Sequence, residues 1–449
     1  MKFNIHPNAI ESFNEQALNL VDLVKATPRQ SKVDASFETD IRSRFNITAK
    51  DIVGNPKEKL ADYRGNIIGR YFESSGIRYA LEDSEHELLA ALAKKIQRLP
   101  AFRDRLSQKY IEENLFSWIE LVHGSKGQPD SYFEFLIRDA SSVVIPITVH
   151  VPIAYTAVEE PFVFCGVLIE NLSKVYIDIL EKEMIPRATD EDALRKFFEK
   201  LRNDHQGYAS TKLTLECEYN YAEEKAIGMS QQAIDLLSIY SGAALLPDVK
   251  NLSRIKGAEH LATSTAIFHT AEDCTTTRDR IVDRASDMQW KISKQDLNNY
   301  RKCGLDVISE LVIKSKRTDF ESCLLNSITI YSKASLTAEP LEKLVYTLSA
   351  LETALLKNEN EPIQQNLGER IALFIGDELE QRKRIIRSVK NVYEIRSKYL
   401  HHGNSSSELD ELTEFFRYVW TFFVVLLGCT KKYKSKAEFL DAINDKKLT

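Results

Sequence analysis

The sequence predicts an α+β, predominantly helical protein, in which a mixed α+β N-terminal region precedes a C-terminal antiparallel helical bundle. Apolar residues recur at helical spacing through most of residues 318–449, whereas two earlier segments alternate residue by residue, as strands do. A chain of 449 residues is also too long for one ordinary core. We therefore expect three regions, with boundaries at 1–124, 125–317 and 318–449.

The first region, residues 1–124, is predicted to be mainly helical. The segment "SEHELLAALAKKIQRL" begins with Ser84 and Glu87, which have the spacing of a capping box. The segment "LSQKYIEENLFSWIELV" keeps a helical period up to Gly124. Two helices and a following Gly- and Pro-containing loop are the expectation here.

The second region, residues 125–317, is predicted to mix strands and helices. Apolar residues alternate in "VVIPITVHVPIAYT" and in "TKLTLECEYNY", where the apolar set runs from Leu213 to Tyr221. Pro146 and Pro152 place the first strand at a sheet edge or divide it in two. The segments "DEDALRKFFEKLRN" and "SQQAIDLLSIYSGAALL" are expected to be helices.

The third region, residues 318–449, is predicted to be helical throughout. Thr318 and Glu321 again have capping-box spacing, Gly376 is a predicted helix end, and Ser435 precedes Glu438 as a further cap. Four to five helices with short connections indicate an antiparallel bundle. One expected helix face carries a continuous apolar stripe: Leu341, Leu344, Val345, Leu348, Leu351 and Leu355. The apolar run "YVWTFFVVLL" is expected to be the central helix of the bundle or a dimer face, with core preferred.

Composition excludes several classes of protein. The net charge of -6 and pI near 6.0 argue against a cationic surface that coats nucleic acid, so any RNA or DNA site must be local. The 6 cysteines are scattered, which makes zinc and disulfides unexpected. Neither a secretory signal nor an apolar run of roughly 18 to 20 residues is visible, so we expect a cytoplasmic protein without a membrane span.

Signatures of familiar catalytic classes are also missing. The chain contains no GxSxG, HExxH or GxxxxGK[ST] motif, so no cofactor is expected. The histidines outside the segment discussed next occur singly, without the spacing of metal ligands, and no metal site is predicted. His150 is expected to point outward from its strand.

The segment "VYEIRSKYLHHG" interrupts an apolar pattern with an arginine. Ile385, Val389 and Val392 lie on one predicted helix face, and Arg396 takes the next place on that face, before Leu400. A guanidinium cannot lose its charge, so on such a face it needs a partner or a function. Glu352 interrupts the stripe of its own helix in the same way. An ion pair between Glu352 and Arg396 is one interpretation, and it does not exclude a functional one.

His401 follows Arg396 by five residues, about 140° around an ideal helix. The two side chains therefore meet only if the last helical turn is distorted or if two copies of the chain face each other. A histidine at a helix C-terminus experiences the negative end of the helix dipole, which favours its protonated form and suits a general acid.

The same segment is locally basic. Between Arg382 and His402 there are seven Lys and Arg residues and one acid, Glu394. This local excess would suit an anionic ligand, although basic residues before a helix-ending glycine are also ordinary helix chemistry. The candidate residues for an anionic ligand are Arg384, Arg387, Lys390 and Lys398, which the resemblance described next assigns to RNA binding. Tyr393 and Tyr399 flank Arg396, where aromatic rings stack on bases or, more commonly, pack.

The succession "LEKLVYTLSALETALL", "LGERIALFIG" and "VYEIRSKYLHHG" resembles the HEPN domain of the ApeA-like type over about residues 320–445. Its most specific part is the arginine, four intervening residues and histidine of "RSKYLH". The resemblance implies a helical bundle that forms a homodimer and acts as a metal-independent endoribonuclease in anti-phage defence or as a toxin. The partner would be host or phage RNA, and a phage-derived trigger would act on the preceding sensor or regulatory part.

For individual residues, the resemblance implies that Arg396 binds the scissile phosphate and that His401 is the general acid or base for attack by the ribose 2′-hydroxyl. Ser397 occupies the polar position after the arginine, where related motifs often have Asn, Asp or His. His402 doubles the histidine, and Glu352 and Tyr393 are expected to support the site. The alternative function is a non-catalytic HEPN-like module that binds RNA or a protein, with Arg396 in a structural ion pair.

Overall fold

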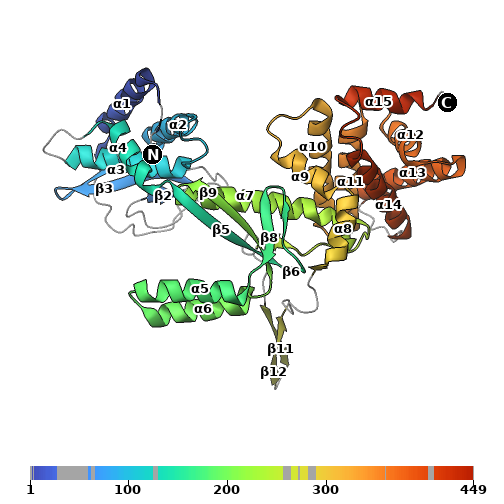
Figure 1. Cartoon of the computed structure of the whole chain (residues 1–449), viewed down its shortest axis with the longest axis horizontal. Coiled ribbons are helices and arrows are strands. Elements are labelled where there is room, and N and C mark those ends of the chain that lie inside the picture. Colours follow the sequence, from blue (N-terminus) through green and yellow to red (C-terminus); the bar gives the residue numbers. More distant parts are fainter. Residues whose placement is uncertain are drawn as a thin grey trace. The chain divides into compact units, whose positions relative to one another are not determined.

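The chain forms two compact units, each built from two stretches of sequence. The first unit comprises Met1–Thr148 and Thr214–Lys225, and the second comprises Val149–Leu213 and Ala226–Thr449. The computed structural model describes the following residues: 3, 5–27, 59–61, 66–124, 130–255, 264–271, 274–281, 290–358, 360–402 and 409–447. Within these, the side chains of residues 27, 187, 204, 264–281 and 399–402 lie outside the description. The fold is α+β and mostly helical, as predicted (Figure 1).

The first unit packs helices on a small antiparallel sheet, which the sequence analysis did not predict. The sheet has the strand order β1-β4-β3-β2. Its elements and the helices of the unit are β1 (Lys25–Thr27), β2 (Lys59–Ala61), β3 (Ile67–Ser74), β4 (Ile77–Glu82), α1 (Pro7–Asp22), α2 (Asp83–Gln97), α3 (Gln108–Gly124) and α4 (Tyr132–Val143). Ser75 and Gly76 both have positive φ, the backbone of a two-residue turn that suits the twist of the β3–β4 hairpin.

The predicted capping box at Ser84 and Glu87 is wrong. Helix α2 begins at Asp83, directly after β4, and its N-cap residue Glu82 makes no side-chain capping bond. Ser84 therefore lies inside the first turn, where its hydroxyl bonds the Glu85 carboxylate at 3.2 Å. The strand leads straight into the helix, so no loop residue is left to act as a cap. The predicted end of α3 at Gly124 is confirmed.

Strands of the mixed region form a five-stranded sheet with the order β10-β5-β9-β8-β7. Its strands are β5 (Ile145–Ala154), β7 (Phe162–Phe164), β8 (Val167–Asn171), β9 (Ala209–Cys217) and β10 (Arg254–Ile255). β5 is one strand in spite of its two prolines. Strand β10 pairs with β5 only at Ile153 and Ala154. At Pro146 the one described neighbouring strand is therefore β9, so this part of β5 is an edge, where a proline is tolerated.

The strand predicted to run through Tyr221 ends at Cys217, so its last part is corrected. Helix α7 (Tyr219–Leu237) starts two residues later. Glu218 causes this switch, because its carboxylate accepts hydrogen bonds from the backbone N–H groups of Asn220 and Tyr221 at 2.6 and 2.7 Å. A side-chain acceptor for the first free N–H groups starts a helix regardless of the alternating pattern.

The remaining elements of this region comprise short strands and a helical hairpin. They are β6 (Thr156–Val158), β13 (Trp290–Ile292), β11 (Ser264–Ala271), β12 (Cys274–Ile281), α5 (Lys174–Met184), η2 (Ile185–Arg187), α6 (Glu191–His205), η3 (Ser238–Tyr240) and η4 (Gly242–Ala244). β6 pairs with β13 in parallel, and β11 pairs with β12 in antiparallel orientation. The predicted helix at "DEDALRKFFEKLRN" is confirmed as α6.

The described residues of 318–449 form helices and their connections, as predicted, but they contain six helices where four to five were expected. These helices are α10 (Asp319–Ala334), α11 (Pro340–Leu355), α12 (Ile363–Ile375), α13 (Leu379–His402), α14 (Leu409–Leu427) and α15 (Lys436–Asp445), and they are preceded by α8 (Lys294–Lys302) and α9 (Leu305–Ile313). Helices α10 and α11 pack together and are joined only by residues 335–339, so they run in opposite directions.

Most helix boundaries of this bundle follow the sequence signals. The capping box of Thr318 and Glu321 is present, Gly376 is the C-cap of α12, and the Ser435 side chain caps α15. The serines at 405–407, a residue type that favours helix N-caps, come shortly before α14 and lie outside the described residues. "YVWTFFVVLL" is core, since Val419, Phe422, Phe423, Leu426 and Leu427 are at most 1% exposed. Among the helices that the structure describes, none is long and apolar enough to cross a membrane.

Candidate functional site

Helix α13 carries every predicted site residue except Glu352, which lies on α11. Its buried face anchors it in the bundle, with Ile385, Val389 and Val392 at most 1% exposed. Arg396 lies on the same face one turn later, as the spacing predicts. The apolar core shifts at this point to Ile395, which is 4% exposed, so the helix stays anchored beside the arginine.

The predicted ion pair between Glu352 and Arg396 is present. An Nη1 atom of Arg396 lies 3.5 Å from Oε1 of Glu352. Tyr393 donates its hydroxyl to the same carboxylate oxygen at 2.8 Å. Its ring centroid lies 5.9 Å from the guanidinium carbon. Tyr393 therefore packs and bonds inward, and it joins Arg396 to α11 through one shared carboxylate.

The two contacts to Glu352 differ in strength. Burial, and then the nearby Glu352 carboxylate, raise the pKa of Tyr393, so the phenol stays protonated and donates a charge-assisted bond. The Arg396 contact is longer than an ideal hydrogen bond, and both partners are partly exposed, at 30% and 25%. An ion pair of this kind contributes about 0.2–1 kcal/mol. Glu352 is therefore held mainly by Tyr393.

Arg396 retains hydrogen-bonding capacity that the protein does not use. Its Nε atom is buried and has no hydrogen-bond partner among the described residues. A guanidinium has five N–H donors, and the one contact to Glu352 satisfies few of them. The side chain is thus neither buried and satisfied, as a purely structural arginine would be, nor freely mobile in solvent.

The backbone of α13 remains α-helical through His402, so the helix includes both histidines of the motif. The His401 and His402 side chains lie outside the described residues, while Ser397 is described and exposed. At about 100° per residue, the His401 position is about 140° from Arg396 around the helix axis. The backbone up to His402 therefore contains no distortion that would bring the two positions onto one face.

The predicted RNA-binding residues lie on the solvent side of α13, not beside Arg396. Arg384, Arg387, Lys390 and Lys398 are exposed. Their helical positions are about 120–180° from that of Arg396, on the side that also holds the His401 position. Only one of them is near an acid within this helix, since Lys390 lies 4.0 Å from Glu394. Arg396 thus lies at the buried edge of α13, whereas the other basic residues lie on the outer face of the same helix.

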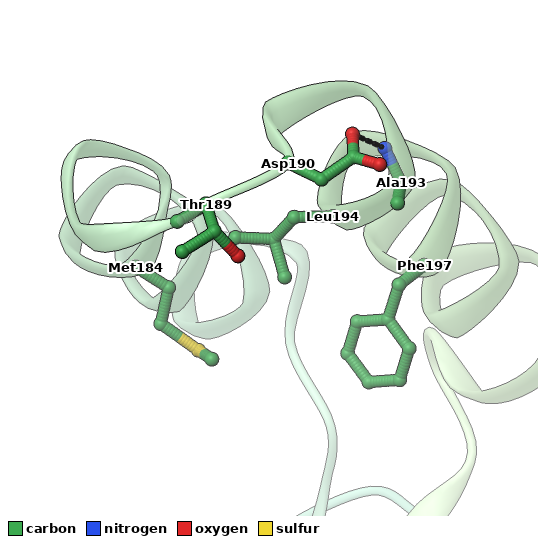
Figure 2. Close-up of a pocket in the computed structure, with 7 residues that line it drawn as sticks. Met184, Thr189, Asp190, Ala193, Leu194 and Phe197 are labelled. Carbon is green, nitrogen blue, oxygen red and sulfur yellow. Dashed lines mark hydrogen bonds between the residues drawn. The ribbon is translucent and has the colours of Figure 1, made fainter.

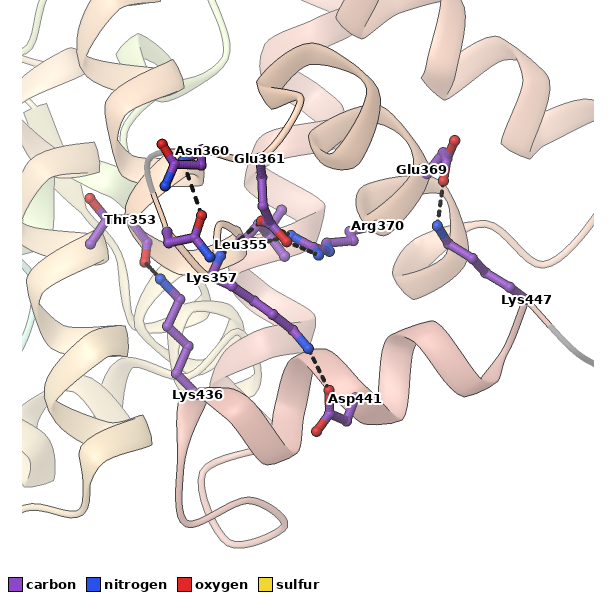
Figure 3. A network of polar contacts seen from close by, with 11 residues as sticks. Thr353, Leu355, Lys357, Asn360, Glu361, Glu369, Arg370, Lys436, Asp441 and Lys447 are labelled. Atoms are coloured by element: carbon purple, nitrogen blue, oxygen red, sulfur yellow. Dashed lines mark hydrogen bonds and ion pairs between the residues drawn. The ribbon is translucent and has the colours of Figure 1, made fainter.

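A second arginine, which the sequence analysis did not single out, fixes the end of α11. Arg370 is 4% exposed, and its guanidinium donates to both carboxylate oxygens of Glu361 at 2.8 Å. Figure 3 shows this contact. It also donates to the backbone oxygen of Leu355, the last residue of α11. The hydrogen bond from Arg370 lowers the pKa of Glu361 to about 2. The sequence contains a signal for this residue, because Arg370 lies among the apolar residues of "LGERIALF" as Arg396 lies among those of its own helix.

An apolar cavity of about 600 Å³ lies at the α5–α6 hairpin and offers little chemistry (Figure 2). Met184, Leu194 and Phe197 are its largest apolar lining residues. Its one carboxylate, Asp190, already caps α6 by accepting the backbone N–H of Ala193 at 2.9 Å. Among the described residues there is also no group of three or more His, Cys, Asp or Glu side chains arranged to hold a metal ion.

Comparison of the chain with protein-family models, with curated proteins and with solved structures finds no match. Interpretation of the site therefore depends on the residues themselves and on their geometry.

Proposed function

We propose that this protein is a metal-independent endoribonuclease of the HEPN type that acts in the cytoplasm in anti-phage defence or as a toxin. The observation that carries the proposal is the state of Arg396. It is a permanent cation that Glu352 and Tyr393 hold from one side, and its Nε has no hydrogen-bond partner among the described residues. Unused donors on a positioned guanidinium suit a phosphate, which arginine binds through two parallel bonds.

The proposed reaction begins with a neutral His401 imidazole that takes the proton of a ribose 2′-hydroxyl. The 2′-oxygen then forms a bond to phosphorus as the bond to the 5′-oxygen breaks. Arg396 stabilises the negative charge that develops on the phosphate oxygens. The His401 imidazolium formed in the first step gives its proton to the leaving 5′-oxygen, so the products are a 2′,3′-cyclic phosphate and a 5′-hydroxyl. DNA lacks the attacking hydroxyl and is not a substrate.

Two copies of the chain are part of this proposal. Arg396 and His401 occupy opposite sides of one continuous helix, so a single copy does not present both to one phosphate. Across a two-fold axis, Arg396 of one copy faces His401 of the other. The basic outer face then extends the site toward the flanking phosphates of the RNA.

The alternative, a non-catalytic module that binds RNA or a protein, is favoured by the observed ion pair. The two functions differ in what happens when Arg396 or His401 is replaced. In the binding module, loss of His401 leaves the activity in cells unchanged, because only the surface of α13 matters.

The test is cleavage of a mixed RNA pool in EDTA by the wild type, Arg396→Ala and His401→Ala, combined with a phage challenge of cells that express each. Arg417→Ala, an exposed arginine on α14, is the matched control. We expect cyclic phosphate ends with the wild type and the control, and loss of both cutting and protection in the two site variants. Equal protection by folded wild type and both site variants would exclude the nuclease. Protection by both the wild type and His401→Ala, without RNA cleavage by either, would support the binding module.

A further inference from the structure

A cavity of about 430 Å³ lies where strands β5, β8 and β9 meet the start of helix α5. Four polar side chains from four different elements line it: His150, Glu170, Lys212 and Tyr176. Val158, Pro161 and Leu172 provide apolar walls. Its volume is within the range of about 300–1,000 Å³ that is usual for small-molecule sites.

His150 is the unusual residue of this cavity, because its side chain, expected to point outward from its strand, is covered by the Tyr176 ring. Both of its ring nitrogens are buried, and neither has a hydrogen-bond partner among the described residues. Burial, and then the charge of Lys212, lower the pKa of His150, so the ring is neutral near pH 7. A neutral imidazole has one N–H donor and one acceptor nitrogen. Leaving either group buried without a partner is unfavourable, so a ligand that pairs with them gains affinity.

The other polar groups differ in how far the protein already uses them. The Asn171 amide is occupied, since it binds the backbone N–H and C=O of Val158 at 2.9 and 2.7 Å. Glu159 accepts the backbone N–H of Lys294 at 2.7 Å. Lys212 and Glu170 lie 3.6 Å apart, beyond hydrogen-bond distance, so both retain capacity. Two carboxylates against one ammonium make the cavity lining slightly acidic, which disfavours a free anion.

We propose that this cavity binds the base of a free nucleoside. The edge of a nucleobase places N–H donors next to acceptor atoms, which matches one donor and one acceptor on His150. The Glu170 carboxylate accepts a further N–H, and Lys212 donates to a ring carbonyl. The apolar walls and the Tyr176 ring, whose centroid lies 4.7 Å from that of His150, cover the faces of a flat heterocycle.

The test is isothermal titration of the full-length protein with adenosine, guanosine, cytidine and uridine, and separately with inorganic phosphate. The first variant, His150→Phe, keeps a flat ring against Tyr176 and removes both nitrogens. The second, Glu170→Gln, removes a charge without changing shape, and Glu199→Gln, an exposed carboxylate on α6, is its matched control. We expect saturable binding of at least one nucleoside, weakened at least tenfold by His150→Phe and by Glu170→Gln and unchanged in the control.

Three results would overturn the proposal: no nucleoside binds the folded wild type, inorganic phosphate alone binds, or both cavity variants bind a nucleoside as the wild type does. If His150→Phe does not fold, Glu170→Gln decides. The inference is independent of the proposed ribonuclease, so Arg396→Ala is expected to bind nucleoside normally even where it abolishes RNA cleavage.

Discussion

Arg396 shows how one side chain combines a fixed position with unused binding capacity. Tyr393 lies three residues before it on the same helix and donates to the carboxylate that Arg396 also contacts. The strong phenol–carboxylate bond orients Glu352, and the oriented carboxylate then limits the positions of the guanidinium. Tyr393 is therefore a positioning residue in the proposed reaction, and it does not touch the phosphate.

We expect Tyr393→Phe to lower the free energy of unfolding by about 1–2 kcal/mol, because it removes a hydrogen bond to a partly buried charged group. Urea denaturation at neutral pH measures this. Tyr418→Phe is the control, since Tyr418 bonds Glu414 on an exposed helix surface and its loss is expected to cost under about 0.5 kcal/mol. Equal stability of the wild type and Tyr393→Phe would mean that the phenol does not hold Glu352.

The same variant also tests positioning within the proposed function. If Tyr393 orients the guanidinium, Tyr393→Phe lowers kcat for RNA cleavage more than it raises KM, because transition-state contacts suffer most from a misplaced cation. A change in KM alone would assign Tyr393 to RNA binding.

Glu361 predicts an acid-sensitive contribution to stability. Its pKa is about 2 in the folded protein because of the hydrogen bond from Arg370, compared with about 4.3 in an unfolded chain. A depressed folded-state pKa gives stability that is present above about pH 4.5 and is lost as the pH falls toward 2. We expect this loss to be on the order of 2 kcal/mol.

Glu361→Gln checks that contribution. Denaturant unfolding between pH 6 and pH 3 is expected to show a shallower fall in stability for Glu361→Gln than for the wild type. The variant starts lower at pH 6, because a buried Arg370 then lacks its anionic partner. Parallel pH profiles would show that the ion pair contributes little.

At the scale of elements, α13 has two faces with different chemistry. Its inner face places Arg396 next to α11, and the bidentate pair of Arg370 and Glu361 holds the C-terminal end of α11 in place. Its outer face carries the exposed basic residues. Tyr393 of α13 therefore fixes the Glu352 side chain, and Arg370 of α12 fixes the end of α11, the helix that carries Glu352, before any ligand binds.

Thr318 and Ser84 both have the spacing of a capping box, but only Thr318 caps a helix, so substitutions at the two positions should differ in their effect on stability. Thr318→Ala is expected to destabilise the protein by about 1 kcal/mol, because its hydroxyl accepts the backbone N–H of Glu321 and that carboxylate bonds the backbone of Thr318 in return. Ser84→Ala is expected to change stability by less than about 0.5 kcal/mol, since Ser84 lies within a helix and caps nothing. Thermal or urea unfolding of both variants decides, and a larger effect at Ser84 would contradict the observed start of α2.

At the scale of the whole molecule, the proposed site needs two chains, and complementation tests this directly. Neither Arg396→Ala nor His401→Ala homodimers are expected to cut RNA. A mixed dimer retains one intact pair, with Arg396 from one chain and His401 from the other. After subunit exchange, an equal mixture is expected to recover about a quarter of the wild-type activity, since half of the dimers carry one of two sites.

Light scattering of the purified full-length protein is the accompanying measurement of oligomeric state. Recovery of cleavage on mixing supports a site shared between chains. A dimer that shows no recovery would place both residues of each site on one chain, and a monomeric wild type that cuts RNA would exclude the shared site.

The sequence by itself determined the local features of this protein. Helical spacing and caps predicted most of the C-terminal helices, because Thr318, Gly376 and Ser435 act on backbone groups within a few residues of themselves. The placement of Arg396 on a buried face also followed from spacing alone. An acidic residue on a neighbouring stripe was enough to predict its partner Glu352.

Only the tertiary structure decided which charged groups are satisfied. Lys343 lies in a helix of ordinary apolar pattern, yet it is 1% exposed and bonds three backbone carbonyls about 100 residues earlier in the chain. Nε of Arg396 and both ring nitrogens of His150 have no hydrogen-bond partner among the described residues. This too depends on which groups the neighbouring strands and helices place beside them. Whether a donor or acceptor finds a partner is a property of the packed surroundings, and spacing along one element does not contain it.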